Sequence, residues 1–144
     1  MTKHLGITGS REGLTEEQRK YMRVILAELR RLNYGYLHHG DCVGVDEEVA
    51  LYAKALGYRL VCHPPTDPKL RAHVPSQEVR EAHPYLERNK HIVAASDMLL
   101  GFPNSPESVP RSGTWSTIKY ARYHDVYTVV IAPDGGRSAF NHRH

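Results

Sequence analysis

The chain has 144 residues, of which 40% are hydrophobic and 24% are charged, a composition typical of one soluble globular domain. Its formal net charge of +3 suits a phosphate-bearing ligand but excludes the concentrated basic face of a dedicated duplex-DNA binder. The two cysteines form no C-x-x-C pair, and the sequence contains neither a signal-peptide pattern nor an apolar run of membrane-spanning length, so we expect a cytoplasmic protein.

Short apolar runs alternate along the chain with segments of helical periodicity, which is the pattern of an α/β domain with a parallel sheet. The first strand is followed by a helix that begins at Thr15, where Gln18 completes a capping box. The five predicted strands lie at 4–8, 34–40, 58–63, 97–102 and 126–132. The later predicted helices lie at 45–56, 85–95 and 112–124.

Right-handed crossovers between five mostly parallel strands predict a three-layer α/β domain with the strand order 3-2-1-4-5. In that order the connections of strands one and four leave their neighbouring ends in opposite directions, so a ligand crevice is expected there. Residues 66–84 are the least regular segment and are expected to form a flexible loop or lid. Residues 134–144 show no clear element, so we predict one domain over 1–133 and a mobile tail.

Two loops at the predicted crevice carry groups that suit a phosphate. The first loop offers a tight strand exit, a hydroxyl and a guanidinium. The second precedes a helix, whose free N–H groups and partial positive charge attract anions. Either loop alone is equally well explained by an ordinary turn or by helix capping, so the argument rests on both facing one crevice. The predicted phosphate-binding residues are Gly9, Ser10, Arg11, Ser112, Gly113 and Thr114.

The segment HHGDCVGVD follows the second strand and carries further candidate ligand contacts, which are His39, Gly40, Asp41 and Asp46. The two carboxylates suit ribose hydroxyls or a base edge, while Asp46 is equally placed to cap the next helix. A zinc site is conceivable here because histidines and cysteines are near in sequence, but their spacing matches no closed-site pattern. We therefore predict no metal and no cofactor.

The helix at 85–95 carries Arg88, Asn89 and Lys90 in succession. Successive helical residues point about 100° apart, so these three side chains cannot all reach the crevice, and a solvated polar face is the alternative. We take Arg88 and Asn89 as ligand-binding candidates.

Four segments, GSR, HHGDCVGVD, ERNKHIVAASDMLLGF and SGTWSTIKYA, stand in the order and spacing of the SLOG superfamily. The chain resembles this group from Gly6 to about Pro133 and is most similar to its small YspA-like or YpsA-like proteins. The resemblance implies a Rossmann-like domain that binds a nucleotide or a nucleotide derivative. It also implies single-stranded DNA binding of the DprA/Smf kind as an alternative, although the chain lacks the basic and aromatic density of a stacking groove.

The resemblance extends in part to the LOG phosphoribohydrolases, which release the base from a nucleoside monophosphate. Arg88 matches the arginine of their Glu-Arg-Lys segment, and residues 113–114 match the Gly-Thr pair of their Pro-Gly-Gly-x-Gly-Thr-x-x-Glu motif. Thr117 stands in place of the glutamate, although glycosidic cleavage needs a nearby carboxylate. If the protein is an enzyme, the candidate catalytic residues are Arg88, Asp41, Asp46 and Glu107.

These observations favour a nucleotide-binding or nucleotide-sensing module. An N-glycoside hydrolase of nucleoside 5′-monophosphates and a single-stranded DNA binder are the alternatives. We also expect a homo-oligomer, because related folds commonly pair and the helix with Tyr120 and Tyr123 offers apolar surface.

Overall fold

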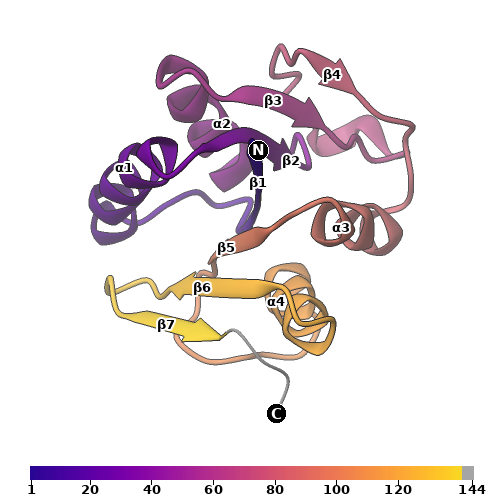
Figure 1. Cartoon of the computed structure of the whole chain (residues 1–144). Coiled ribbons are helices and arrows are strands. Elements are labelled where there is room, and N and C mark those ends of the chain that lie inside the picture. The colour runs from indigo at the N-terminus through magenta and orange to yellow at the C-terminus, as the bar shows by residue number, and fades with distance from the viewer. Residues whose placement is uncertain (141–144) are drawn as a thin grey trace.

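The computed structural model describes residues 1–140 and has a seven-stranded sheet between two layers of helices (Figure 1). The strands are β1 (Lys3–Gly9), β2 (Tyr34–His39), β3 (Arg59–Cys62), β4 (Glu78–Val79), β5 (Met98–Phe102), β6 (Tyr127–Ile131) and β7 (Arg137–Phe140). The α-helices are α1 (Glu16–Arg31), α2 (Val45–Ala55), α3 (Tyr85–Ala94) and α4 (Gly113–Tyr123), and the 3₁₀ turn is η1 (Pro68–Leu70). The order is β4-β3-β2-β1-β5-β6-β7, and only β7 runs antiparallel to its neighbour in this described sheet.

The prediction of a five-stranded sheet is therefore wrong in strand number. The five expected strands lie at the centre in the order β3-β2-β1-β5-β6, and a short strand extends each edge. Strand β4 comes from the segment expected to be a loop or lid, and β7 comes from the expected mobile tail. The tail prediction is thus corrected for 137–140, which pair with β6, while 141–144 lie outside the described residues.

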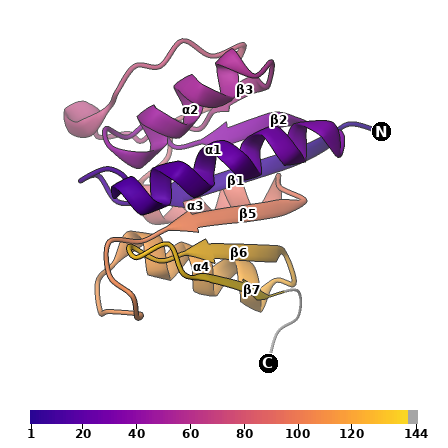
Figure 2. The same ribbon diagram turned by 90° about the vertical axis from the view of Figure 1, so that its left-hand side faces the viewer.

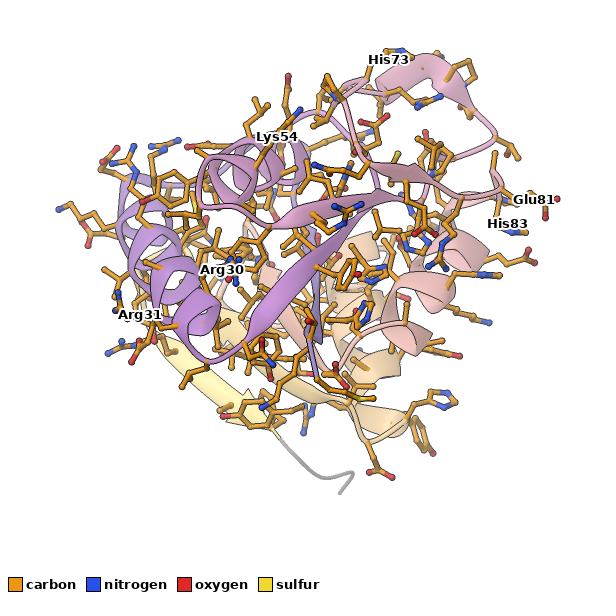
Figure 3. All side chains as sticks on the ribbon, turned by 45° about the horizontal axis from the view of Figure 1, so that its top comes forward. Arg30, Arg31, Lys54, His73, Glu81 and His83 are labelled. Atoms are coloured by element: carbon orange, nitrogen blue, oxygen red, sulfur yellow. The ribbon has the colours of Figure 1, made fainter. Side chains whose placement is uncertain are left out.

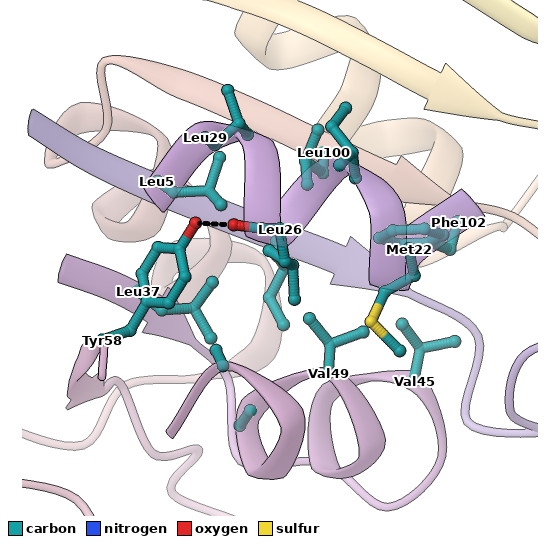
Figure 4. Close-up of a cluster of buried hydrophobic side chains, with 14 of the residues drawn as sticks. Leu5, Met22, Leu26, Leu29, Leu37, Val45, Val49, Tyr58, Leu100 and Phe102 are labelled. Atoms are coloured by element: carbon teal, nitrogen blue, oxygen red, sulfur yellow. Dashed lines mark hydrogen bonds between the residues drawn. The ribbon is translucent and has the colours of Figure 1, made fainter. Parts of the chain in front are cut away.

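Helices α1 and α2 cover one face of the sheet, and α3 and α4 cover the other (Figures 1 and 2). The larger core forms where Met22 of α1 and Val49 of α2 pack with the inward side chains Leu5 and Leu37 (Figure 4). Tyr58 closes this core, because its buried hydroxyl donates a hydrogen bond of 2.7 Å to the carbonyl of Leu26. A smaller apolar cluster packs α3 and α4 on the opposite face.

The start of α1 confirms the predicted capping box. The Thr15 hydroxyl accepts from the Gln18 backbone N–H, and the Gln18 side chain accepts from the Thr15 N–H. The buried Gln18 amide also donates to the carbonyls of Pro103 and Ile131, at 2.8 and 2.9 Å. These bonds tie the beginning of α1 to the ends of β5 and β6, and so fix the loop that joins β1 to α1.

Strands β1 and β5 are parallel neighbours, and their connections lead to helices on opposite faces of the sheet. The predicted switch point is therefore present between the carboxyl ends of these two strands. Among residues 1–140, no helix combines the length and the apolar character that a bilayer crossing requires.

Candidate functional site

A cavity of about 670 Å³ opens at the switch point, within the size range of small-molecule sites. Its walls come from the β1–α1 loop, the start of α2, the η1 segment, α3 and the β5–α4 loop. It is lined by nine of the predicted ligand contacts, which are Gly9, Ser10, Arg11, Asp46, Arg88, Asn89, Ser112, Gly113 and Thr114. The crevice expected between these strand ends is therefore a cavity, and the contacts of these residues with a ligand stay a prediction.

Three predicted contacts lie behind the cavity wall instead. Asp41 is fully buried, and its two carboxylate oxygens accept from Arg71 Nε at 2.9 Å and from the Val74 N–H at 2.8 Å. His39 is also fully buried and bonds through Nε2 to the Ser76 hydroxyl at 2.9 Å. The Gly40 carbonyl accepts from the guanidinium of Arg88. All three hold the wall together rather than face the cavity.

The catalytic candidates are divided in the same way. Asp46 and Arg88 line the cavity, whereas Asp41 is held by Arg71 and Glu107 is an exposed loop residue outside the lining. The buried Thr117 hydroxyl donates to the Gly113 carbonyl at 2.8 Å, so it braces α4 and supplies no carboxylate chemistry.

In the β1–α1 loop, the polar groups of Ser10 are already hydrogen-bonded within the protein. The Ser10 N–H donates to the Phe102 carbonyl at 3.3 Å, and its hydroxyl donates to Glu12 at 2.9 Å. The Ser10 carbonyl accepts from Val45, which places the start of α2 beside the loop. Ser10 therefore shapes the loop, and the exposed guanidinium of Arg11 is the loop's cationic group at the cavity.

The start of α4 retains free backbone donors. The Ser112 side chain caps the helix by accepting from the Trp115 N–H at 3.1 Å, as the capping interpretation predicted. Within residues 1–140, the N–H groups of Gly113 and Thr114 have no backbone or side-chain acceptor, and both residues line the cavity. This helix end is thus available to an anion, with the helix dipole in the favourable direction.

Arg88 and Asp46 are the buried charges of the cavity wall. Arg88 is 5% exposed, and its Nη1 donates to the carbonyls of Gly40 and His63. Asp46 accepts from the N–H groups of Gly40 and Cys42 at 3.1 and 3.4 Å, so it supports this turn instead of capping α2. Burial raises the pKa of Asp46 to about 6, although the nearby Arg88 charge acts in the opposite direction.

Sequence reasoning missed several lining residues because they come from the irregular segment or from the helix after it. Asp67 accepts from the Lys69 N–H at 3.0 Å and so orders the η1 turn beside the cavity. Tyr85, in the first turn of α3, has its ring centroid 5.5 Å from the Arg88 guanidinium carbon. The remaining polar or ionisable lining residues that were not predicted as contacts are Thr8, Glu12, Cys42, Lys69, Asn104 and Arg111.

No protein-family model matches the sequence, and no curated protein matches it. Solved structures do share the fold. The structural-genomics target TM1055 superimposes with a TM-score of 0.70 and 17% identity, covering 94% of this chain and 77% of that chain. The molybdenum cofactor binding protein from the phototrophic bacterium Rippkaea orientalis gives a TM-score of 0.71 and 17% identity, with 92% and 77% covered.

DNA processing protein A (DprA) from Streptococcus pneumoniae also superimposes, with a TM-score of 0.61 and 17% identity. The match covers 91% of this chain and 50% of DprA. Together the three structures show that the chain shares their Rossmann-like α/β fold, while membership of the SLOG superfamily stays a prediction.

Proposed function

We propose that the cavity binds a nucleotide or a nucleotide-derived small molecule, with its phosphate between Arg11 and the start of α4. The observation that carries this proposal is the pair of free N–H groups at Gly113 and Thr114, which line the same cavity as Arg11. Lys69 and Arg111 add cationic side chains to the lining. An anionic group in this position meets a helix dipole and guanidinium donors together.

In this proposal the sugar and the base of the ligand contact other parts of the same cavity. The Asp46 carboxylate is the acceptor for sugar hydroxyls, because Asp41 is already held by Arg71 and Val74. The Tyr85 ring at the wall offers a face on which a base can stack. Two proteins of similar fold are named for binding a molybdenum cofactor and for processing DNA, which supports a small-molecule or nucleic-acid partner.

Arg11→Ala is expected to weaken ligand binding by about 10- to 100-fold, because a charge-assisted hydrogen bond contributes about 1.5–3 kcal/mol. The ligand is first identified by mass spectrometry, after incubation with nucleoside mono-, di- and cyclic phosphates and NAD derivatives. Titration calorimetry then compares the variant with Arg31→Ala, an exposed arginine at the far end of α1 (Figure 3). Equal affinity in both variants would contradict the proposed phosphate site.

A second candidate function is hydrolysis of the N-glycosidic bond, and the position of Asp46 favours it. Of the three carboxylates considered from the sequence, Asp46 alone lines the cavity, and a pKa of about 6 suits a group that exchanges protons near neutrality. Free base is then expected in the incubation samples and should disappear in Asp46→Asn. Ligand recovered intact from the unmodified protein would leave binding as the function, and oligonucleotide affinity that falls steeply with salt would instead support the DprA-like alternative.

A further inference from the structure

A cluster of metal-ligating side chains lies on α3 outside the cavity. His83, Glu87 and His91 are spaced four residues apart, which brings them to one side of the helix and of the turn before it. One ligand atom from each lies within 4.8 Å of the other two. His83 Nδ1 is 2.6 Å from a Glu87 carboxylate oxygen, and the rings of His83 and His91 stack with centroids 4.3 Å apart.

We propose that these three side chains bind a divalent transition metal ion of the Zn²⁺ class. Two imidazoles and one carboxylate form a ligand set that suits Zn²⁺, and solvent can complete the coordination because Glu87 and His91 are exposed. The site is independent of the nucleotide-binding proposal, since none of the three residues lines the cavity.

The position of His83 is already fixed before any metal binds. Its backbone N–H donates to the Pro64 carbonyl at 3.2 Å, and its carbonyl accepts from the Thr66 N–H at 3.1 Å. Its Nε2 lies 3.5 Å from a Glu81 carboxylate oxygen, on the other side of the ring from Glu87. Figure 3 shows Glu81 and His83 together at one edge of the molecule. A carboxylate behind a ligating histidine is the usual means of orienting its ring.

A second group of ligand-type side chains, His39, Asp41 and Cys62, serves as an internal comparison. All three are at most 1% exposed, and both carboxylate oxygens of Asp41 already accept hydrogen bonds, from Arg71 and from the Val74 N–H. Both ring nitrogens of His39 are also bonded, to the Asp41 N–H and the Ser76 hydroxyl. That group is a closed structural network, whereas the cluster on α3 is accessible to a metal.

Metal binding at this cluster would hold the turn before α3 against the helix. The N-cap of α3 is Pro84, which makes no side-chain capping bond, so the helix start lacks that usual stabilisation. The other side of α3 carries Arg88 and Asn89 to the cavity. The metal would therefore brace one wall of the cavity without touching it.

Calorimetric titration of the chelator-treated full chain with Zn²⁺ tests the site, with Co²⁺ absorption as a second readout. The sequence also contains His142 and His144, so all measurements use a variant in which both are alanine. We expect one equivalent of metal to bind in that background. His91→Ala and Glu87→Gln should each weaken binding at least about tenfold, since loss of even an outer partner of a metal ligand costs about 10- to 100-fold.

The matched control is His124→Ala, an exposed histidine at the end of α4. We expect this variant to bind the metal with unchanged affinity. It thereby separates the loss of a proposed ligand from a nonspecific effect of removing one surface imidazole. The proposal is overturned if the variant without His142 and His144 binds no metal. It is also overturned if that variant still binds the metal with unchanged affinity after His91→Ala and after Glu87→Gln. Thermal unfolding of the metal-free variants verifies that each exposed substitution leaves the fold intact.

Discussion

Arg88→Ala is expected to destabilise the folded chain by about 2–4 kcal/mol at pH 7, because it leaves two buried carbonyls without their charged donor. Arg88 is 5% exposed, and its guanidinium joins the carbonyls of Gly40 and His63 across the cavity wall. Its charge also acts to lower the pKa of the buried Asp46. Alanine removes the donors and the counter-charge together, so the pKa of Asp46 should rise further, and ligand binding should be lost with the wall.

Urea unfolding of the purified variant measures this loss, and two substitutions serve as controls. Lys90→Ala removes an exposed cation from the same helix and is expected to change stability by no more than about 0.5 kcal/mol. Arg88→Lys retains the charge but not the guanidinium, whose Nη1 donates to both carbonyls while its Nε donates to the Asn89 side chain. We therefore expect its loss of stability to lie between those of Arg88→Ala and Lys90→Ala. If Arg88→Ala unfolds at the same urea concentration as Lys90→Ala, Arg88 does not hold the wall.

The central part of the fold could be predicted because its signals are local. Apolar runs gave the five inner strands, and the Thr15–Gln18 capping box marked the start of α1. The edge strand β4 lacked such signals, since it has only two residues and both are exposed. For β7, in contrast, the residues just before the strand carry a hairpin signal. The sequence Asp134-Gly135-Gly136 forms a tight turn, in which the Gly136 N–H donates to the Asp134 side chain at 2.8 Å and starts the hairpin with β6.

The position of the site could be predicted from topology, but the roles of single residues could not. Asp41 lies beside Asp46 in sequence, yet its partner Arg71 is 30 residues away, in a segment with no regular pattern. Tertiary pairing of this kind decides which of two similar carboxylates faces the cavity. Lys69 also comes from this segment without a regular pattern, so its place in the cavity lining could not be predicted either. The expected self-association through the helix with Tyr123 stays a prediction.

Acidification is expected to destabilise the protein well above the pH at which most carboxylates titrate. Burial is the main cause that lowers the pKa of His38 and of His63 to about 3 and that of His39 to about 4, from an ordinary 6.5. His38 sits between two other rings, with hydrogen bonds of 2.8 Å to His4 and 2.9 Å to His63. Asp46 acts in the opposite direction, because its pKa is raised from 3.8 to about 6.

The direction of the change in stability with pH follows from the number of protons that the folded and the unfolded chain bind. Below pH 6.5 the unfolded chain protonates the three histidines while the folded chain keeps them neutral, so their stability contribution is complete above 6.5 and is lost as the pH falls. Between pH 6 and 4 the folded chain gains a proton on Asp46 that the unfolded chain lacks, which offsets one histidine. The net excess of two protons predicts a loss of about 2.7 kcal/mol per pH unit near pH 5.

Urea unfolding at pH 7, 6 and 5 measures this slope directly. His63→Gln replaces one imidazole by an amide that still offers a donor and an acceptor, so we expect the slope to fall by about 1.4 kcal/mol per pH unit. His73→Gln, at an exposed position in the segment before β4, is the matched control and should leave the slope unchanged. A stability that stays constant between pH 7 and 5, or a slope that His63→Gln does not reduce, would mean that the buried histidines take up protons in the folded chain. The hydrogen-bonded row His4–His38–His63 would then be a cationic network rather than a neutral one.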